Sequence, residues 1–470
     1  MAASAKSRRA FLLLAIIAAG FAIRFVNIDQ WPLWGDEGLT LLLGQWSLRH
    51  LFLVPIDPTP GLYYALHKLL LGPMVDAAGA RYISLACGTL LIPAAYFLAR
   101  EIRVPALLTA ALVALSFPLI DYSQEARAYS LLVLLLTCSA ALFARWTRSR
   151  QQKHLLLALL LGILSFYTHL VSIFWLGPMC LATAWIARRQ AVQPLLLFTL
   201  LAIPEIGRLL TYNPGNFSWL AQATPIQAAD TLSRALLPFR PTGWWLIGPA
   251  LLLAWRIWAH RKALSRWGCE NRGAAFTLAA LLAFPILIWL FGLVVKPLFM
   301  TRTILAAVPG FMAAFALLLK FEHRLARWGV AGLYAASLLV TGTTRDKDDW
   351  REIAQRVKGD AILMCQPWQA TAMRHALPAD NLMFLRYDNG LVQVAGKPWQ
   401  RAYFRTLLTK ELMPEALDRA AGASMALGPV WPVRGGQIEQ MATAPVTLGQ
   451  AIAYCDSLRA ADRQQRYMAD

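Results

Sequence analysis

Long apolar runs separated by short basic clusters constrain this chain more than any other feature of its sequence. Hydrophobic residues make up 58% of its 470 residues and charged residues only 15%, whereas a soluble protein usually carries about 25% charged residues. The sequence therefore predicts a polytopic α-helical membrane protein, although several runs are shorter than the roughly 20 residues of a straight span. About eleven runs are recognised: 10–26, 82–99, 104–120, 129–144, 155–170, 172–187, 192–210, 244–258, 274–295, 303–319 and 328–341.

The first run follows Lys6, Arg8 and Arg9, as the apolar part of a signal peptide would. A cleaved signal peptide is therefore the alternative interpretation of this run. Because no clear cleavage site follows and the chain continues into further apolar helices, we expect a membrane anchor.

Charge gives the expected topology. The formal net charge is +19, but the basic residues occur in short clusters between apolar runs, as in membrane proteins, and not in a stripe typical of nucleic-acid binding. A cytoplasmic N-terminus and about eleven spans place every cluster on the cytoplasmic side. The opposite side then receives loops 27–81 and 211–243 and the tail. The clusters lie within 100–103, 145–153, 188–189, 256–272 and 320–327.

The tail differs in composition from the apolar part, so we divide the chain into a membrane core, residues 1–342, and a C-terminal domain, residues 343–470. The tail alternates patterns of helices and strands, which predicts a small extracytoplasmic α/β domain of about 125 residues. None of the six cysteines has metal-ligand spacing, and a disulfide between Cys365 and Cys455 stays open. The expected helices are 350–357, 369–376 and 411–421, and the expected strands are 361–365 and 381–387.

Two adjacent carboxylates, Asp36 and Glu37, follow the first apolar run. Carboxylates are costly in hydrocarbon, so we expect them in a wet pocket at the membrane surface, and we interpret this pocket as an active site. An alternative is that Asp36 is the N-cap of a helix over 39–48, with Glu37 interacting favourably with the helix dipole. The two interpretations are compatible.

Other polar residues fall on the same side of the membrane in this topology. Lys296 and Arg302 lie where basic residues are disfavoured, which indicates binding of an anion. Alternatively, Arg127 is an ordinary interfacial arginine paired with Glu125, and His169 is a hydrogen-bonded residue at a helix end. The set is Asp57, His67, Glu125, Arg127, Tyr129, His169, Glu205, Arg208, Lys296 and Arg302.

Nucleotide motifs are absent from the sequence: it has no GxxxxGK[ST] and no GxGxxG after a strand. It also has no GxSxG nucleophile elbow. ATP or dinucleotide chemistry is thus unsupported. A reaction outside the cytoplasm then needs a donor that arrives already activated, and a lipid-linked phosphate is one that a membrane enzyme can reach.

Five motifs together resemble the membrane-embedded C-type (GT-C) glycosyltransferases. The branch most similar contains the polyprenyl-phosphate-sugar-dependent protein mannosyltransferases and the lipid A aminoarabinose transferase. One departure is Asp57-Pro58-Thr59-Pro60, where many relatives have a lysine or histidine before a Pro-Pro pair, so a lysine contact from this loop is in doubt. The motifs are Trp34-x-Asp36-Glu37, Pro60-Gly61-Leu62-Tyr63-Tyr64, Gln124-Glu125-Ala126-Arg127-x-Tyr129, Tyr167-Thr168-His169 and Lys296-Pro297 leading to Arg302, with Asp349-Trp350-Arg351 opening the tail.

This resemblance implies a multi-pass enzyme of the bacterial inner membrane with a periplasmic C-terminal domain. It would transfer a sugar, with inversion, from a polyprenyl-phosphate donor to a lipid A, lipopolysaccharide, other surface glycan or protein acceptor. Asp36 would be the base, with Glu37 orienting or substituting. Arg127, Lys296 and Arg302 would stabilise the leaving phosphate. Tyr129 and His169 would bind sugar or phosphate, Glu125, Asp57 and His67 would support the site, and a divalent metal near the carboxylates stays open.

Two alternatives remain. A transporter or flippase of lipid-linked sugars would place acids at mid-helix around a midplane site, but the apolar runs contain few acids. A glycan ligase would carry a large basic extracytoplasmic loop, whereas loop 211–243 has only Arg234 and Arg240. Both alternatives therefore rank below the transferase.

Overall fold

The computed structural model describes residues 2–30, 33–44, 46–53, 59–72, 76–210, 222–237 and 247–341, together with five short strands between residues 361 and 438. The chain divides into two compact units. We call the first unit the helical core, and it comprises Met1–Ile28, Trp46–Gly72 and Arg81–Arg345. The second unit comprises Asp29–Gln45, Pro73–Ala80 and Asp346–Asp470.

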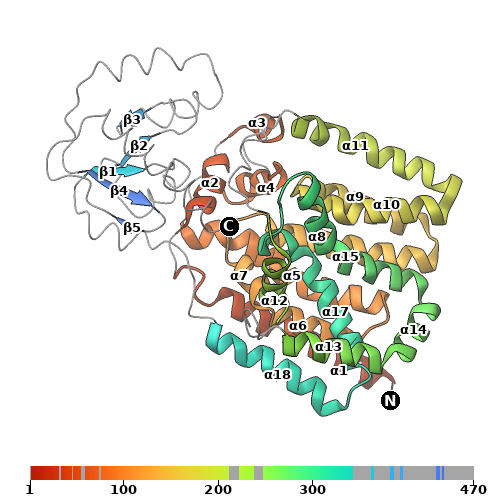
Figure 1. Ribbon diagram of the computed structural model, residues 1–470. Coiled ribbons are helices and arrows are strands. Elements are labelled where there is room, and N and C mark those ends of the chain that lie inside the picture. Colours follow the sequence, from red (N-terminus) through yellow and green to blue (C-terminus); the bar gives the residue numbers. More distant parts are fainter. Residues whose placement is uncertain are drawn as a thin grey trace. The chain divides into compact units, whose positions relative to one another are not determined.

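Helices account for nearly all of the described residues before residue 342 (Figure 1). They are α1 (Ala2–Phe25), α2 (Gly35–Gly44), α3 (Leu48–Leu53), α4 (Leu62–Leu70), α5 (Ala77–Glu101), α6 (Ala106–Ala114), α7 (Phe117–Ser123), α8 (Tyr129–Ser149), α9 (Gln152–Phe166), η1 (Leu170–Ser172), α10 (Ile173–Ala187), η2 (Arg188–Ala191), α11 (Val192–Leu210), α12 (Pro225–Leu236), α13 (Ile247–Ala259), α14 (Arg261–Glu270), α15 (Arg272–Val294), α16 (Thr301–Ile304), η5 (Leu305–Ala307), α17 (Val308–Leu319) and α18 (Arg324–Thr341).

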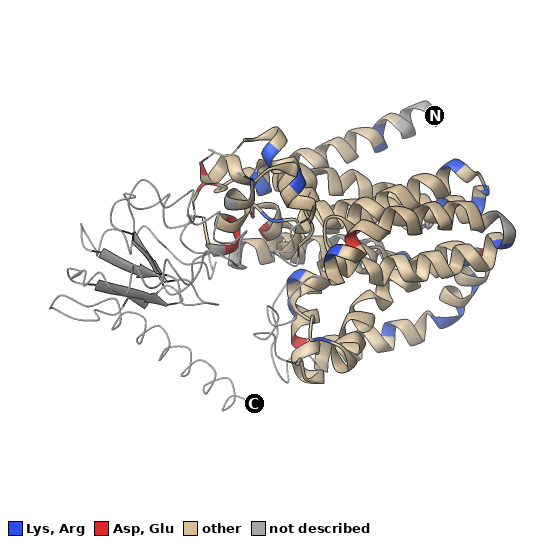
Figure 2. Cartoon of the chain, turned by 90° about the horizontal axis from the view of Figure 1, so that it is seen from above, with Lys and Arg blue, Asp and Glu red and all other residues tan. Residues whose placement is uncertain are grey.

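Each predicted apolar run contains one or more of these helices, so the mostly helical membrane architecture is confirmed. Within the described residues, 6 helical segments are long and apolar enough to cross a membrane, or 7 if the bent pair α6–α7 counts as one span. Three further apolar helices are shorter: Gln152–Phe166, Ile247–Ala259 and Gly329–Leu338. The count of about eleven spans stays a prediction. Figure 2 shows lysines and arginines mainly at helix ends and in short loops.

Small polar side chains connect the central helices of the core. In α8, the Ser139 hydroxyl donates to the Ala158 carbonyl of α9 at 2.8 Å and accepts from the Trp175 indole of α10 at 3.1 Å. Trp175 is fully buried and packs edge-on against Phe143, with 6.0 Å between ring centroids. Such hydrogen bonds across helices contribute to packing where lipid offers no hydrophobic driving force. They hold α8, whose first residue is Tyr129, in a fixed position.

A break between α6 and α7 bends the chain by 58°. A helix end inside an apolar environment leaves carbonyls without partners, each of which costs several kcal/mol unless it is satisfied. Arg24 of α1 is fully buried there, and its guanidinium donates to the carbonyls of Ala114 at 2.9 Å and Val113 at 3.1 Å. It also donates to the Ser123 hydroxyl of α7 at 3.3 Å. One side chain thus satisfies the end of α6 and holds α7.

The close approach of α5 to the same place requires a glycine. A Cβ on Gly88 would lie 1.9 Å from the Ser123 hydroxyl. Gln124, directly after α7, donates its side-chain amide to the carbonyls of Arg24 and Val26, each at 2.8 Å. The end of α1 and the segment after α7 are therefore held together from both sides.

The C-terminal strands of the second unit form one five-stranded sheet in the order β3-β2-β1-β4-β5. Its strands are β1 (Ala361–Met364), β2 (Leu382–Leu385), β3 (Val392–Val394), β4 (Val430–Arg434) and β5 (Gln437–Ile438). The central strand β1 pairs in parallel with β2 (Ile362 opposite Leu382) and with β4 (Ala361 opposite Val430). The outer pairs, β2–β3 and β4–β5, are antiparallel.

Both strands predicted in the tail are confirmed as β1 and β2. Parallel neighbours need long crossover connections, usually helical, which agrees with the expected helix positions. The expected helices 350–357, 369–376 and 411–421 lie outside the described residues, as do Cys365 and Cys455, so the complete α/β domain stays a prediction.

Replacing Arg24 by methionine keeps an unbranched side chain but removes its hydrogen bonds to α6 and α7. We expect Arg24→Met to lower stability by about 2–4 kcal/mol, because buried carbonyls lose their donors. The thermal unfolding midpoint of purified protein in detergent measures this. Arg9→Met is the matched control, since Arg9 lies on the same helix and is exposed. Equal midpoints for the two variants would contradict the structural role of Arg24.

Candidate active site

The guanidinium of Arg127 is the centre of a polar cluster in the helical core. Arg127 is only 4% exposed and precedes α8 by two residues. Its Nη1 donates to the Tyr64 hydroxyl at 3.0 Å and its Nη2 to the Thr59 hydroxyl at 3.5 Å. Arginine keeps its charge at any accessible pH. The core therefore holds a positive charge in a desolvated environment, oriented by hydroxyl groups.

Two of the sequence motifs meet here through α4 and α5. The backbone carbonyl of Arg127 accepts from the Ser84 hydroxyl of α5 at 3.1 Å, and Ser84 in turn hydrogen-bonds the Tyr63 hydroxyl at 2.8 Å. Tyr63 and Tyr64 are buried, with their rings edge-on at 6.2 Å. The motif ending in Tyr63-Tyr64 and the motif around Arg127 thus form one hydrogen-bonded unit, although they are far apart in sequence.

A third motif is joined to α4 by its backbone. The Leu62 amide donates to the Tyr167 carbonyl at 3.1 Å. Gly61, just before α4, lies so close to α3 that a Cβ would be 2.4 Å from the Leu51 carbonyl oxygen. This close approach is the physical reason for a glycine at this position. It fixes the position of α4, and therefore of Tyr64, relative to α3.

Aromatic contacts place His169 beside Tyr129, two residues after Arg127. The Tyr129 ring, 4% exposed, lies 5.6 Å from the His169 ring and 5.2 Å from the Tyr122 ring. His169 Nδ1 accepts from the Val171 amide at 3.3 Å, which caps η1. The interpretation of His169 as a hydrogen-bonded helix-end residue is thereby confirmed. Because Nδ1 is the acceptor, the neutral ring carries its proton on Nε2.

Acidic and basic residues surround the Tyr122 hydroxyl, which interacts electrostatically with Glu125, Asp121 and Arg302. Glu125 is 4% exposed, in the segment between α7 and α8. Arg302, in the short helix α16, is half-buried, and its Nε lies 2.8 Å from the Met300 sulfur. Glu125 and Arg302 therefore lie near the same tyrosine.

Three further candidate residues were predicted from the sequence for this part of the chain. Lys296 is half-buried in the loop between α15 and α16, and His67 is fully buried in α4. Asp57 lies outside the described residues.

Asp36 and Glu37 belong to the second unit and lie in the first turn of α2. The helix begins at Gly35 and ends at Gly44, so the prediction that Asp36 caps a helix over 39–48 is wrong. Gly35 is the first residue of this helix. Glu37 stabilises the helix start, because its Oε2 accepts a hydrogen bond from the Trp34 amide at 3.3 Å. Glu37 is fully buried, whereas Asp36 is partly exposed. The two carboxylates therefore differ in environment.

Sequence reasoning did not select several residues that build this cluster. Ser84 and Thr59 are small hydroxyl residues without any local pattern, and only their long-range contacts with Tyr63 and Arg127 reveal them. Tyr122 lies two residues before a recognised motif. Glu205 and Arg208, in contrast, were selected from the sequence, and they form a buried ion pair in α11 at 2.7 Å beside the motif tyrosine Tyr167.

Metal binding is a separate question, because the resemblance left a divalent cation open. Among the described residues, no group of three histidine, cysteine, aspartate or glutamate side chains could hold a metal ion. Asp57 lies outside the described residues, so a divalent metal near the carboxylates stays an open prediction.

Comparisons with known proteins add a similarity of fold. No protein-family model and no curated protein matches the chain. Among solved structures, ArnT from Cupriavidus metallidurans is 16% identical with a TM-score of 0.49, over 76% of this chain and 70% of that chain. The S. cerevisiae protein O-mannosyltransferase Pmt1-Pmt2 complex is 15% identical (TM-score 0.35, 50% and 37% covered). The Archaeoglobus fulgidus oligosaccharyltransferase is 12% identical (TM-score 0.42, 93% and 60% covered).

Removing the Tyr64 hydroxyl tests how Arg127 is held. We expect Tyr64→Phe to lower stability by about 1.5–3 kcal/mol, because a hydrogen bond to a buried charged group is lost. Thermal unfolding in detergent is the measurement. Tyr82→Phe, at an exposed tyrosine of α5, is the control and is expected to unfold like the wild type. Equal unfolding midpoints for Tyr64→Phe and Tyr82→Phe would show that the Tyr64 hydroxyl is not needed to hold Arg127.

Proposed function

We propose that this chain is an inverting glycosyltransferase that moves a sugar from a polyprenyl-phosphate donor to an extracytoplasmic acceptor. The observation that carries the proposal is that three distant motifs contact one another around the buried Arg127. The motif ending in Tyr64 accepts a hydrogen bond from Arg127, and the motif ending in His169 contacts Leu62 and Tyr129. Buried cations with oriented donors are what a phosphate leaving group requires. A solved structure of ArnT, similar in fold, is bound to undecaprenyl phosphate, so we take this lipid phosphate as the donor carrier.

The reaction we propose is a single displacement. The acceptor hydroxyl attacks the anomeric carbon from the side opposite the phosphate, and Asp36 takes the hydroxyl proton as the new C–O bond forms. The bond from the anomeric carbon to the phosphate oxygen breaks, and polyprenyl phosphate leaves with the electron pair. Arg127, with Lys296 and Arg302, stabilises the charge on this phosphate, and Tyr129 and His169 bind sugar or phosphate.

Environment divides the roles of the two carboxylates. Glu37 is buried and its side chain accepts a backbone hydrogen bond, which suits a residue that positions the start of α2. Asp36 is partly exposed, as a base that must meet an acceptor has to be. We therefore assign the proton transfer to Asp36 and the orienting role to Glu37.

The proposal includes the membrane arrangement. We propose a multi-pass protein of the bacterial inner membrane with about eleven spans, a cytoplasmic N-terminus and a periplasmic α/β domain. Its acceptor would be lipid A, lipopolysaccharide, another surface glycan or a protein. A transporter gains no support from the described spans, because the buried ion pair Glu205–Arg208 lies in the last turns of α11 and not at its middle.

Replacing Asp36 by asparagine tests the base. We expect Asp36→Asn to abolish sugar transfer, with a loss of about 10²–10⁴ in rate. Mass spectrometry of surface glycolipids, polysaccharides and envelope proteins would compare a deletion strain, the wild type and the deletion carrying Asp36→Asn. One sugar lost from one class in the deletion, and not restored by the variant, would name donor and acceptor together.

Two matched variants sharpen this experiment. Asp76→Asn is the control, because Asp76 caps the Gly79 amide at 2.7 Å and asparagine caps equally well. Glu37→Gln keeps an acceptor oxygen for the Trp34 amide and is expected to retain substantial transfer. Full restoration of the sugar by Asp36→Asn, at normal expression, would exclude Asp36 as the base. No glycan change in any strain would favour the transporter.

Substitution of Arg127 tests the phosphate site. We expect Arg127→Gln to lower the transfer rate by about 10²–10³, and Arg127→Lys to recover part of it, because lysine keeps the charge but not the two-pronged geometry. Binding of undecaprenyl phosphate to purified protein is the second measurement. Wild-type affinity and rate in Arg127→Gln would remove Arg127 from the donor site.

A further inference from the structure

A pocket of about 890 Å³ lies where the ends of several helices of the core meet. Its wall is formed by the ends of α5, α8 and α10 and by the turn between α14 and α15. None of the candidate active-site residues lines it. Its volume is within the range of about 300–1,000 Å³ that is typical of small-molecule sites. It is therefore a separate cavity of ligand size.

Arginines dominate the charge of this pocket. Four line it, Arg103, Arg148, Arg150 and Arg272, against two acids, Glu101 and Glu270. The lining therefore carries an excess of two positive charges. The positive-inside rule places this end of the helices on the cytoplasmic side, but it does not require that basic side chains gather around a cavity.

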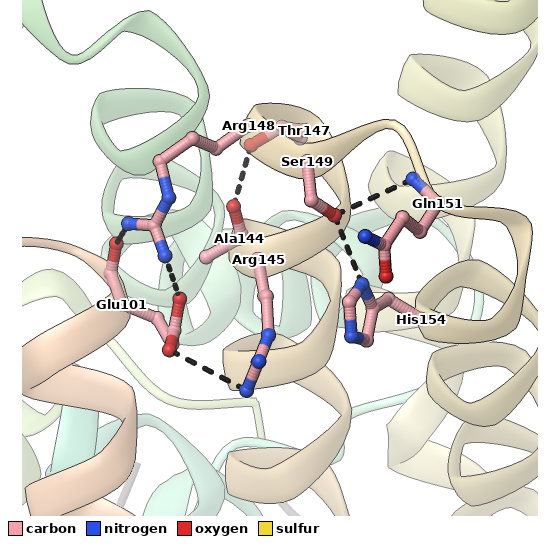
Figure 3. A network of polar contacts seen from close by, with 8 residues as sticks. All are labelled: Glu101, Ala144, Arg145, Thr147, Arg148, Ser149, Gln151 and His154. Carbon is pink, nitrogen blue, oxygen red and sulfur yellow. Dashed lines mark hydrogen bonds and ion pairs between the residues drawn. The ribbon is translucent and has the colours of Figure 1, made fainter.

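One acid is already neutralised within the wall. Glu101 is 8% exposed, and its carboxylate pairs with Arg148 and lies 4.0 Å from Arg145 (Figure 3). Arg148 also donates to the Glu101 carbonyl at 3.2 Å. Among the residues that line the pocket, Glu270 is then the one acid left beside Arg103, Arg150 and Arg272.

A histidine beside this network adds no charge. Burial, with Arg145 and Lys153, lowers the pKa of His154, which keeps the ring neutral at physiological pH. The ring hydrogen-bonds the Ser149 hydroxyl at 2.9 Å, and Ser149 also accepts from the Gln151 amide at 3.4 Å (Figure 3). The turn after α8 is thus held by neutral groups, and the positive charge of the pocket comes from the arginines.

Two of the lining arginines have a left-handed backbone. Arg103 has a φ of 61° and Arg150 a φ of 56°, a conformation that favours glycine and disfavours other residues. An arginine after a helix end is stabilised by the helix dipole, which offsets part of this strain. Arg103 and Arg150 lie just after the ends of α5 and α8, at the rim of the pocket.

An apolar surface adjoins the arginines. Leu181 and Trp185 of α10 line the pocket and are 74% and 85% exposed. The segment Leu170–Ala187 is one of the candidate membrane spans, so this face of α10 lies against lipid. A ligand that fits both features has an anionic head for the arginines and apolar chains for the exposed side chains of α10.

We infer that this pocket binds the phosphate headgroup of an anionic phospholipid, with its acyl chains along Leu181 and Trp185. Basic pockets between membrane helices on the cytoplasmic side are suited to such headgroups. Arg103, Arg150 and Arg272 bind the phosphate, and Arg148 is held by Glu101 at the wall. The inference does not rest on the proposed transfer reaction, because binding is measured without any sugar donor.

Native mass spectrometry of the full-length protein in detergent tests the inference. The probes are dioleoyl phosphatidylglycerol, dioleoyl phosphatidylcholine and inorganic phosphate. We expect preferential binding of phosphatidylglycerol, and a fall in its affinity of about fivefold per arginine in the double variant Arg103→Gln/Arg150→Gln. Glutamine leaves the backbone strain unchanged, and equal unfolding midpoints without lipid check the fold. Should the double variant not fold, Arg272→Gln takes its place.

Arg188→Gln is the matched control. Arg188 is exposed at the end of α10, has a φ of 48° and does not line the pocket. We expect it to bind phosphatidylglycerol like the wild type. An equal loss of affinity in Arg188→Gln would overturn the inference, because surface charge in general would then attract the lipid. Equal binding of both lipids by the wild type would overturn it too. Phosphate that competes with the lipid and loses affinity in the same variants would make this a site for free anions.

Discussion

The bend between α6 and α7 is the constraint on which the helical core depends. It lies among apolar helices, where the carbonyls at the end of α6 find no water, and a single fully buried side chain, Arg24, donates to two of them and to Ser123. Gln124, directly after α7, donates hydrogen bonds to backbone carbonyls at the end of α1. Since the segment carrying Glu125, Arg127 and Tyr129 follows directly, the geometry of the candidate site is set by how this break is satisfied.

In the candidate site, too, a buried arginine is held by hydrogen bonds from several elements. Arg127 is held by hydroxyl groups of Tyr64 and Thr59, and its backbone is held by Ser84. Hydroxyl partners fix the orientation of a guanidinium through directional hydrogen bonds. A structural arginine could use backbone carbonyls alone, as Arg24 largely does. The carbonyl partners of Arg24 at the bend are the physical reason to assign it a packing role.

Sequence patterns predicted the helices well, because each apolar run is a local property, and every one of them contains a helix. The site was predicted in part: the motifs containing Tyr64, Arg127 and His169 do come together, whereas Ser84 and Thr59 are visible only through contacts across the fold. Arg24 was missed because an arginine at the end of an apolar run is indistinguishable from an interfacial one. The capping role given to Asp36 was wrong because the helix begins earlier, at Gly35, where Glu37 accepts the backbone hydrogen bond.

Arginine thus serves three different physical purposes in one chain, and burial with partner type separates them. Arg24 is buried on carbonyls and stabilises a broken helix. Arg127 is buried, donates to the hydroxyls of Tyr64 and Thr59, and is the residue that we propose for the donor phosphate. Arg103 and Arg150 are exposed at a cavity rim, in a backbone conformation that glycine would adopt more easily. Topology alone requires only that basic residues lie on one side of the membrane. The gathering of arginines around one pocket does not follow from that rule, so it is this gathering that calls for a ligand with a negative charge.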